Sequence, residues 1–129
     1  MSQRNILIVD DSIATRNLIK LLLERAGYCV RVAEDGEQAV HVLSQFQADL
    51  ILMDLVLPGM TGVELTRKLK SDPATQSTVI IAFTAYTLVS DVNGALAAGC
   101  DAFIAKPIDS RTFVSQLQTY MDRLLPPGA

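Results

Sequence analysis

Tryptophan is absent from this chain of 129 residues, and aromatic residues make up only 5% of it. It has two cysteines, too few for the disulfide framework of a small secreted domain, so we expect Cys29 and Cys100 to be buried thiols. No apolar run approaches the roughly 20 residues of a membrane span, and residues 1–5 hold no signal-peptide core. We therefore expect a cytoplasmic protein that does not bind a membrane.

The chain also lacks a strong excess of positive or negative charge. The chain has 11 Lys and Arg residues against 14 Asp and Glu, a formal net charge of −3. This balance gives no general attraction to nucleic acid, and no run of basic residues supplies a local one, so we expect no direct nucleic-acid binding. With 50% hydrophobic residues the chain can build a core, and we expect one domain over residues 1–125 and a tail over 126–129.

Short apolar runs alternate along the chain with segments of helical periodicity. The runs have the length and the β-branched content of strands, and they cover residues 6–9, 29–33, 50–53, 79–83 and 102–105. Four are continuously apolar, as in strands covered on both faces, whereas the second contains Arg31 and is expected at a sheet edge. Five such units predict an α/β fold, a parallel sheet with helices on both faces.

Each helix is predicted from an apolar face. In the first, Ser12 is the expected N-cap, and the inward face is expected to be Ala14, Leu18, Leu21 and Leu22. The second and third are expected over residues 36–46 and 61–71, with His41 as a surface or packing residue of the second. The fourth and fifth are expected to turn inward Leu88, Val92, Ala95 and Leu96, and Phe113, Leu117, Tyr120, Met121 and Leu124.

Polar side chains gather where the predicted strands end. Asp10 and Asp11 follow the first strand, Asp54 follows the third, and Thr84 and Lys106 follow the fourth and fifth. In an open parallel sheet, ligands bind beyond the carboxyl ends of the strands. Three carboxylates held together repel one another, and a hard divalent cation relieves that repulsion. Oxygen donors without a nearby His or Cys set favour Mg²⁺ over zinc.

These residues suit the transfer of a phosphoryl group, which needs in-line positioning and charge neutralisation. A carboxylate can be the nucleophile, and Asp54 is the best candidate because it closes the central apolar strand. Lys106 would neutralise the phosphoryl oxygens, and the Thr84 hydroxyl would donate a hydrogen bond to one of them. Singly, each residue has an ordinary structural explanation; only their combination at one sheet edge favours this chemistry.

Nearly the whole chain resembles the receiver domains of bacterial response regulators. The resemblance is carried by Ile-Leu-Ile-Val-Asp-Asp-Ser at 6–12, Leu-Ile-Leu-Met-Asp-Leu-Val-Leu-Pro-Gly-Met-Thr-Gly at 50–62, Phe-Thr-Ala at 83–85 and Ala-Lys-Pro at 105–107. It implies a flavodoxin-like fold with strand order 2-1-3-4-5, the order of the chemotaxis receiver. It also implies a role in a two-component phosphorelay, with phosphorylation by a histidine kinase or a histidine phosphotransfer protein.

The resemblance assigns a role to each site residue. Asp54 would be the phosphoacceptor and would bind Mg²⁺ directly, together with Asp11 and the backbone carbonyl of Val56. Asp10 would bind the ion mainly through water. Thr84 would move toward the phosphoryl group.

Further positions follow from the same resemblance. Phe103 would turn inward as the aromatic switch, and the face of the fourth helix, fifth strand and fifth helix would then bind a downstream protein. Pro107 would follow a cis peptide bond, and Ala85 would leave room for the phosphoryl oxygens. Val56 and Tyr86 match positions that tune dephosphorylation. The domain would catalyse its own phosphorylation and dephosphorylation without being a separate enzyme.

Four interpretations stay open. The chain is a free regulator, which Met1 favours, or the receiver module of a hybrid kinase or longer regulator, which its Phe-Thr-Ala-Tyr and Ala-Lys-Pro-Ile segments also fit. A flavin or nucleotide enzyme on the same fold fits poorly, since Asp-Asp-Ser replaces a glycine-rich phosphate loop after the first strand. A purely structural interaction module would show no response to Mg²⁺.

Overall fold

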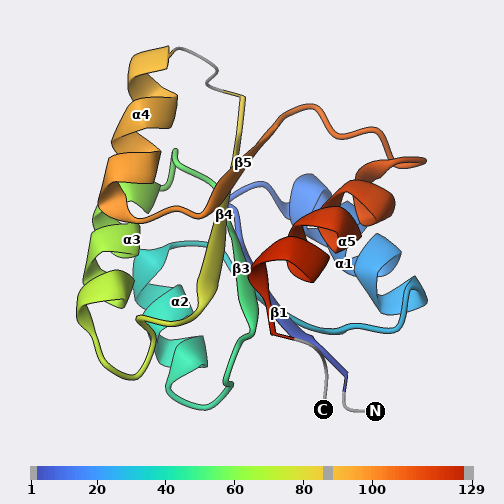
Figure 1. Cartoon of the computed structure of the whole chain (residues 1–129), viewed down its shortest axis with the longest axis horizontal. Coiled ribbons are helices and arrows are strands. Elements are labelled where there is room, and N and C mark those ends of the chain that lie inside the picture. Colours follow the sequence, from blue (N-terminus) through green and yellow to red (C-terminus); the bar gives the residue numbers. More distant parts are fainter. Residues whose placement is uncertain (1–2, 86–88, 127–129) are drawn as a thin grey trace.

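The protein is described here by a computed structural model that covers residues 3–85 and 89–126. In the described residues, strands and helices alternate along the chain (Figure 1). They are β1 (Asn5–Val9), α1 (Ile13–Arg25), β2 (Cys29–Ala33), α2 (Gly36–Leu43), β3 (Leu50–Met53), α3 (Gly62–Ser71), β4 (Val79–Thr84), α4 (Val89–Ala98), β5 (Ala102–Ala105) and α5 (Phe113–Leu124). Within the described residues, no helix is both long enough and apolar enough to cross a membrane.

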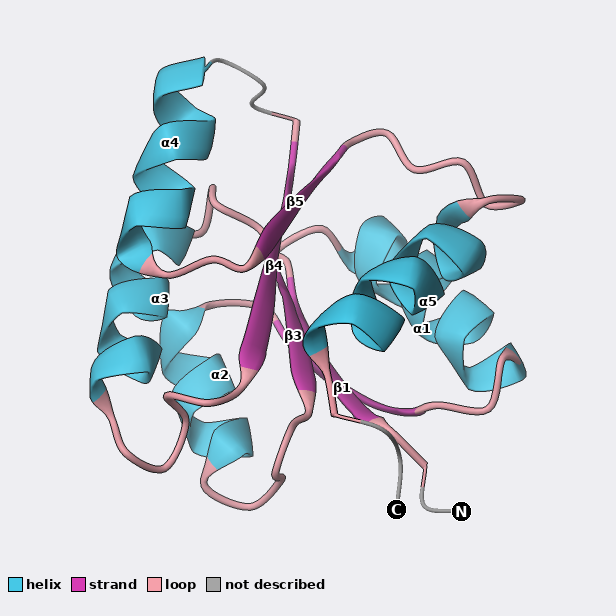
Figure 2. Cartoon of the chain, viewed as in Figure 1, coloured by secondary structure: helices cyan, strands magenta, loops and turns pink. Residues whose placement is uncertain are grey.

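The strands form one parallel sheet in the order β2-β1-β3-β4-β5. Helices α1 and α5 cover one face, and α2, α3 and α4 cover the other (Figure 2). The predicted α/β fold, with strand order 2-1-3-4-5 and helices on both faces, is therefore confirmed. Residues of β2 are expected at an edge, and they are found there, with Arg31 exposed.

Two apolar cores lie on opposite faces of the sheet because successive side chains of a strand point to opposite faces. Leu7 and Val9 belong to the core under α2 and α3, whereas Ile6 and Ile8 belong to the core under α1 and α5. Strands β3 and β4 are buried along their whole length. This rigid centre holds fixed the strand ends from which the candidate site is built.

The predicted inward face of α1 is mostly wrong: of its four residues only Leu22 packs against the core under α1 and α5, and Ala14 is exposed. Leu18 and Leu21 are 41% and 46% exposed, while Ile19 and Leu23, four residues apart, are completely buried. Apolar residues occupy more than half of this helix's circumference, so periodicity alone does not select the buried face. The start is as predicted, because the Ser12 side chain accepts a hydrogen bond from the N–H of Thr15.

Other expectations need smaller corrections. Helix α2 ends at Leu43 rather than residue 46, and Phe46 turns into the core. Cys100 is buried as expected, but Cys29 is only partly buried because it opens the edge strand. Leu96 and Leu124, expected to point inward, are 46% and 38% exposed, and Leu88 lies outside the described residues.

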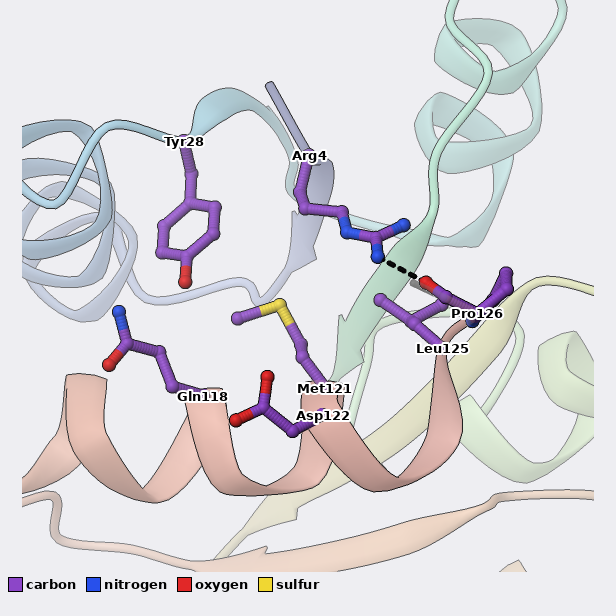
Figure 3. Close-up of a pocket in the computed structure, with 7 residues that line it drawn as sticks. All are labelled: Arg4, Tyr28, Gln118, Met121, Asp122, Leu125 and Pro126. Carbon is purple, nitrogen blue, oxygen red and sulfur yellow. Dashed lines mark hydrogen bonds between the residues drawn. The ribbon is translucent and has the colours of Figure 1, made fainter. Parts of the chain in front are cut away.

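At the amino edge of the sheet, the two ends of the described chain meet. The Arg4 guanidinium donates a hydrogen bond to the carbonyl oxygen of Pro126, which follows α5. Beside this contact is a hollow of about 320 Å³ that Tyr28 and Asp122 help to line (Figure 3). It lies at the opposite edge of the sheet from the carboxylates described next.

Candidate phosphoryl-transfer site

Backbone hydrogen bonds continue the sheet beyond the ends of its strands and so position the polar residues that follow them. The N–H of Asp10 donates to the carbonyl of Ala33 at 3.1 Å, and the N–H of Asp54 donates to that of Val9 at 2.9 Å. At the other side of the sheet, the N–H of Lys106 donates to the carbonyl of Thr84 at 2.9 Å. The residues are therefore held by the sheet rather than by mobile loops.

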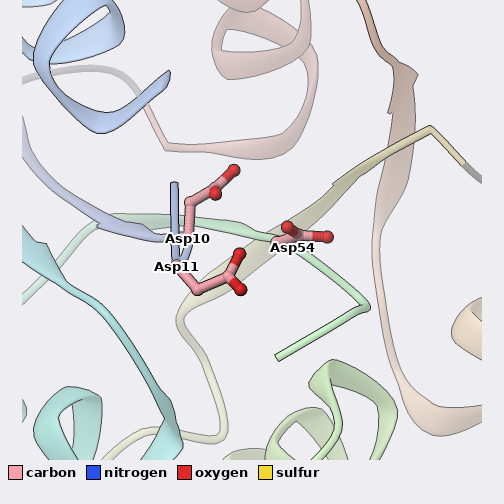
Figure 4. A group of neighbouring side chains, drawn as sticks. All are labelled: Asp10, Asp11 and Asp54. Atoms are coloured by element: carbon pink, nitrogen blue, oxygen red, sulfur yellow. The ribbon is translucent and has the colours of Figure 1, made fainter. Parts of the chain in front are cut away.

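Three carboxylates come together at this edge, as predicted. Asp10, Asp11 and Asp54 each offer an oxygen, and these oxygens lie within 4.8 Å of one another (Figure 4). Asp10 is completely buried and Asp54 is 5% exposed, whereas Asp11 is exposed. Two buried acids and one open to solvent form a cluster that an ion from solution can reach.

Lys106 closes the cluster on the β5 side. Its ammonium lies 2.7 Å from Oδ2 of Asp10 and 3.1 Å from Oδ2 of Asp54, so one cation serves two anions. The peptide bond between Lys106 and Pro107 is cis. The other oxygens are bonded by backbone, since Ser12 N–H donates to Oδ1 of Asp10 and Val56 N–H donates to Oδ1 of Asp54.

The electrostatic state of the cluster follows from burial and shared charge. Burial raises the pKa of the Asp54 carboxyl, Asp10 adds to the rise, and the Val56 N–H and Lys106 only partly offset it. Burial by itself would lower the pKa of Lys106, but the hydrogen bond to Asp10 and the charge of Asp54 outweigh it, and the pKa is raised. The ammonium therefore stays charged, and negative charge remains in excess beside it.

The donor chemistry fits a hard divalent cation. Carboxylate oxygens make up the cluster, without a His or Cys ligand among them. Oxygen ligands of this kind suit Mg²⁺, which accepts one or two carboxylates and completes its shell with water. One ammonium cannot neutralise three carboxylates, and the remaining negative charge favours the binding of a divalent cation.

The loop after β3 approaches the site closely. Gly62, the first residue of α3, donates its N–H to the carbonyl of Leu55. A Cβ on Gly62 would lie 2.3 Å from the carbonyl oxygen of Asp54, so only glycine fits here. Thr61 and Glu64 form a capping box that fixes the start of α3 beside this contact.

The remaining predicted residues occupy varied positions. Thr84 ends β4 and is 1% exposed, Val56 is 49% exposed, and Ala85 is exposed next to the site. Phe103 is half-buried and packs against the core under α2 and α3. Tyr86 lies outside the described residues.

Comparison with known proteins decides the family. Residues 6–118 match the model of the response regulator receiver domain. The chain belongs to this family. As a receiver domain, it is a component of two-component signalling systems.

Related receivers occur as separate chains and as parts of longer ones. The domain is 40% identical over 98% of its length to the phosphate regulon transcriptional regulatory protein PhoB of Pseudomonas aeruginosa, of which it spans 55%. It is 32% identical to the polar-differentiation response regulator DivK of Brucella anthropi, with 92% of this chain and 96% of DivK covered. The receiver domain of the P. aeruginosa sensor histidine kinase PA1611, solved with magnesium in its active site cleft, matches with TM-score 0.82 and 32% identity over 95% of this chain and 98% of that one.

Reasoning from the sequence missed two supports of the receiver site. The Arg16 guanidinium donates to the carbonyl oxygen of Asp10 at 2.7 Å, which braces the turn between β1 and α1. The steric need for Gly62 was missed too, because its neighbours Asp54 and Leu55 lie eight and seven residues away along the chain. The role of Arg16 could have been predicted from the sequence, since Arg16 lies one helical turn after the Ser12 N-cap and so close to the end of β1.

Proposed function

We propose that this receiver accepts a phosphoryl group on Asp54 from a histidine kinase or a histidine phosphotransfer protein. The observation that carries the proposal is that Asp54 lies within reach of both the Lys106 ammonium and two further carboxylates. A nucleophile thus has a fixed cation on one side and a cation-binding cluster on the other. Phosphoryl transfer is catalysed chiefly by such positioning and charge neutralisation.

In the proposed reaction, a carboxylate oxygen of Asp54 attacks the phosphorus of a phosphohistidine. The new P–O bond forms as the P–N bond of the donor breaks, and the leaving imidazole nitrogen recovers a proton. The Val56 N–H and the Lys106 ammonium contact different oxygens of Asp54 and orient the carboxylate. Buried walls limit water at the nucleophile, since Asp54 is 5% exposed.

We assign the metal to Mg²⁺, held by the carboxylates of Asp11 and Asp54 and the carbonyl of Val56, with Asp10 binding mainly through water. When bound, the ion neutralises charge on the oxygens of the transferred group. The carboxylate cluster supports this assignment, as does the magnesium ion in the related PA1611 receiver. Lys106 keeps its role as a fixed point charge next to the ion.

After transfer, the Thr84 hydroxyl would donate a hydrogen bond to a phosphoryl oxygen, and Phe103 would move further inward. The two residues lie on adjacent strands, with Thr84 at the end of β4 and Phe103 within β5. The surface of α4, β5 and α5 would change with them and bind a downstream protein partner, rather than nucleic acid. The receiver would do this in the cytoplasm, catalysing both gain and loss of its own phosphoryl group.

Acetyl phosphate tests the proposal without a kinase. With Mg²⁺, the wild type is expected to take up one phosphoryl group and Asp54→Asn none. Asp122→Asn, an exposed residue of α5, is the matched control and should label like the wild type. Labelling of Asp54→Asn at the wild-type rate would refute the assignment of the phosphoacceptor.

A second context for the same chemistry is a receiver module within a longer protein. It is supported by the likeness to the PA1611 receiver, part of a sensor histidine kinase. The match to DivK over 96% of that regulator supports the free form instead. The length of the encoding reading frame separates the two: a frame ending with residue 129 supports a free regulator, and a longer frame supports a module.

A further inference from the structure

The Lys106 ammonium has an aromatic neighbour besides its two carboxylates. Its nitrogen lies 5.0 Å from the centroid of the Phe83 ring, over the face of the ring. The face of an aromatic ring carries partial negative charge and attracts a cation, most strongly where water is excluded. Phe83 is 1% exposed, so this contact is largely shielded from solvent.

The ring is itself held in place. Phe83 lies in β4 opposite Ile104 of β5, and its ring centroid is 6.1 Å from that of Phe113. Phe113 is the first residue of α5 and is 1% exposed as well. Phe83 is thus a fixed surface next to a side chain with four rotatable bonds, Lys106.

A hollow beside the site offers space into which the Lys106 ammonium could move if the Phe83 ring were absent. An open hollow of about 400 Å³ lies beside the site, lined by Phe83 and Lys106 together with Thr15, Leu18, Ala85, Pro107 and Ile108. Its lining is largely apolar, and Leu18 at its rim is 41% exposed. A lysine stem can lie along such a surface with its ammonium in water, away from the carboxylates.

We propose that Phe83 is a positioning residue whose ring holds the Lys106 ammonium over Asp10 and Asp54. This inference rests on the proposed function for its consequence, since the position of Lys106 matters for phosphoryl transfer to Asp54. The Phe83 side chain has no polar group with which to bind the carboxylates or the transferred group, and we place its effect in the position of Lys106. Moving the ammonium away from Asp10 and Asp54 would leave their charge less neutralised, so the ring is needed for the rate of transfer but not for the binding of Mg²⁺.

Phe83→Leu tests the inference, with Phe46→Leu as the matched control. Phe46 is 8% exposed and carries a similar cation contact, with Arg31 at 5.4 Å, on the other face of the sheet. Phe83→Leu is expected to lower the rate of phosphorylation by acetyl phosphate, at saturating Mg²⁺, by roughly threefold to tenfold. Its dissociation constant for Mg²⁺ should not rise by more than about twofold, because the carboxylates lose a competing cation, and Phe46→Leu should change neither quantity.

A direct readout of the contact needs no phosphorylation. Protons over a ring face resonate upfield, so the ε-methylene protons of Lys106 should be shifted upfield in the wild type and return to ordinary values in Phe83→Leu. An unshifted Lys106 in the wild type would overturn the inference. A wild type that shows this shift but takes up no phosphoryl group would refute the proposed function while leaving the contact established.

Stepwise fluorination of the ring at position 83 separates charge from shape. Mono-, di- and trifluorinated phenylalanines keep the ring's outline and progressively weaken its attraction for a cation. A rate that falls with each fluorine, without loss of Mg²⁺ affinity, supports positioning by the ring. An unchanged rate across the series, or a rate and Mg²⁺ affinity that fall together in Phe83→Leu, would contradict it.

Discussion

The ammonium of Lys106 lies 2.7 Å from a carboxylate oxygen of Asp10, a residue with no solvent exposure. The same nitrogen lies 3.1 Å from Asp54, so the two buried acids depend on one cation that is itself 20% exposed. Removing one partner of a buried ion pair leaves the other charge without compensation, and this costs more than the pair contributes. The site is therefore coupled to the stability of the fold.

Lys106→Met is expected to lower the free energy of unfolding by about 3 kcal/mol in EDTA, because Asp10 loses its cation. Mg²⁺ should restore a large part of the loss, since the divalent ion supplies charge to the same carboxylates. Chemical denaturation with and without Mg²⁺ measures both values. The control is Lys20→Met, which breaks an exposed ion pair with Glu24. It should lower the free energy of unfolding by less than about 1 kcal/mol, and Mg²⁺ should not change that loss. A similar loss of stability in both variants would contradict the role given to Lys106.

Gly62→Ala is expected to destabilise the fold by about 2 kcal/mol or more, because its Cβ would overlap the backbone of Asp54 and Leu55. Moving that backbone also displaces Asp54, so Mg²⁺ binding should weaken in parallel. The control is Gly94→Ala in α4, where a Cβ would meet nothing within 4 Å. That change should stabilise the protein by about 0.5 to 1 kcal/mol through helix propensity, and equal effects at the two glycines would refute the steric explanation.

The raised pKa of Asp54 predicts a pH-dependent gain in stability for Asp54→Asn without Mg²⁺. Below the ordinary pKa of 3.8, Asp54 is neutral in both the folded and unfolded states and costs nothing. As the pH rises through the raised folded-state pKa, the folded protein must hold a buried charge, and the wild type loses stability that the variant keeps. The difference in free energy of unfolding should therefore favour Asp54→Asn at neutral pH and shrink toward pH 3.

For Asp109→Asn, the difference in free energy of unfolding from the wild type should change with pH in the opposite direction. Hydrogen bonds from the Arg111 side chain and backbone lower the pKa of the exposed Asp109, so its charge stabilises the folded state above its ordinary pKa. This variant should be slightly less stable than the wild type at neutral pH and equal to it in acid. The same sign of pH dependence in both variants would contradict the assigned causes.

Ile19→Ala and Leu18→Ala test which face of α1 is buried. Ile19 has no exposure, and truncating it should cost about 2 to 5 kcal/mol of unfolding free energy. Leu18 is 41% exposed, and its truncation should cost less than about 1 kcal/mol. A larger loss of unfolding free energy for Leu18→Ala than for Ile19→Ala would show that the face predicted from the helical periodicity is the buried one.

The sequence predicts the strands of this receiver better than the buried faces of its helices. Runs such as residues 50–53 have the length and composition of strands covered on both faces, whereas α1 offers apolar residues in nearly every direction and its orientation is set by the sheet. The site was predictable for a related reason. Asp10, Asp54 and Lys106 directly follow strands, and the carboxyl ends of parallel strands meet at one edge. The contacts of Phe83 and Gly62 depend on distances across the fold that no local pattern contains.

Localisation of the phosphoryl group tests the central claim most directly. After reaction with acetyl phosphate, borohydride reduces an aspartyl phosphate, and peptide mass analysis then identifies the modified residue. The account predicts modification of Asp54 alone, in Mg²⁺ and not in EDTA. Modification at another residue, or equal modification of Asp54 in EDTA, would contradict the claim that a divalent ion held by Asp10, Asp11 and Asp54 enables the transfer.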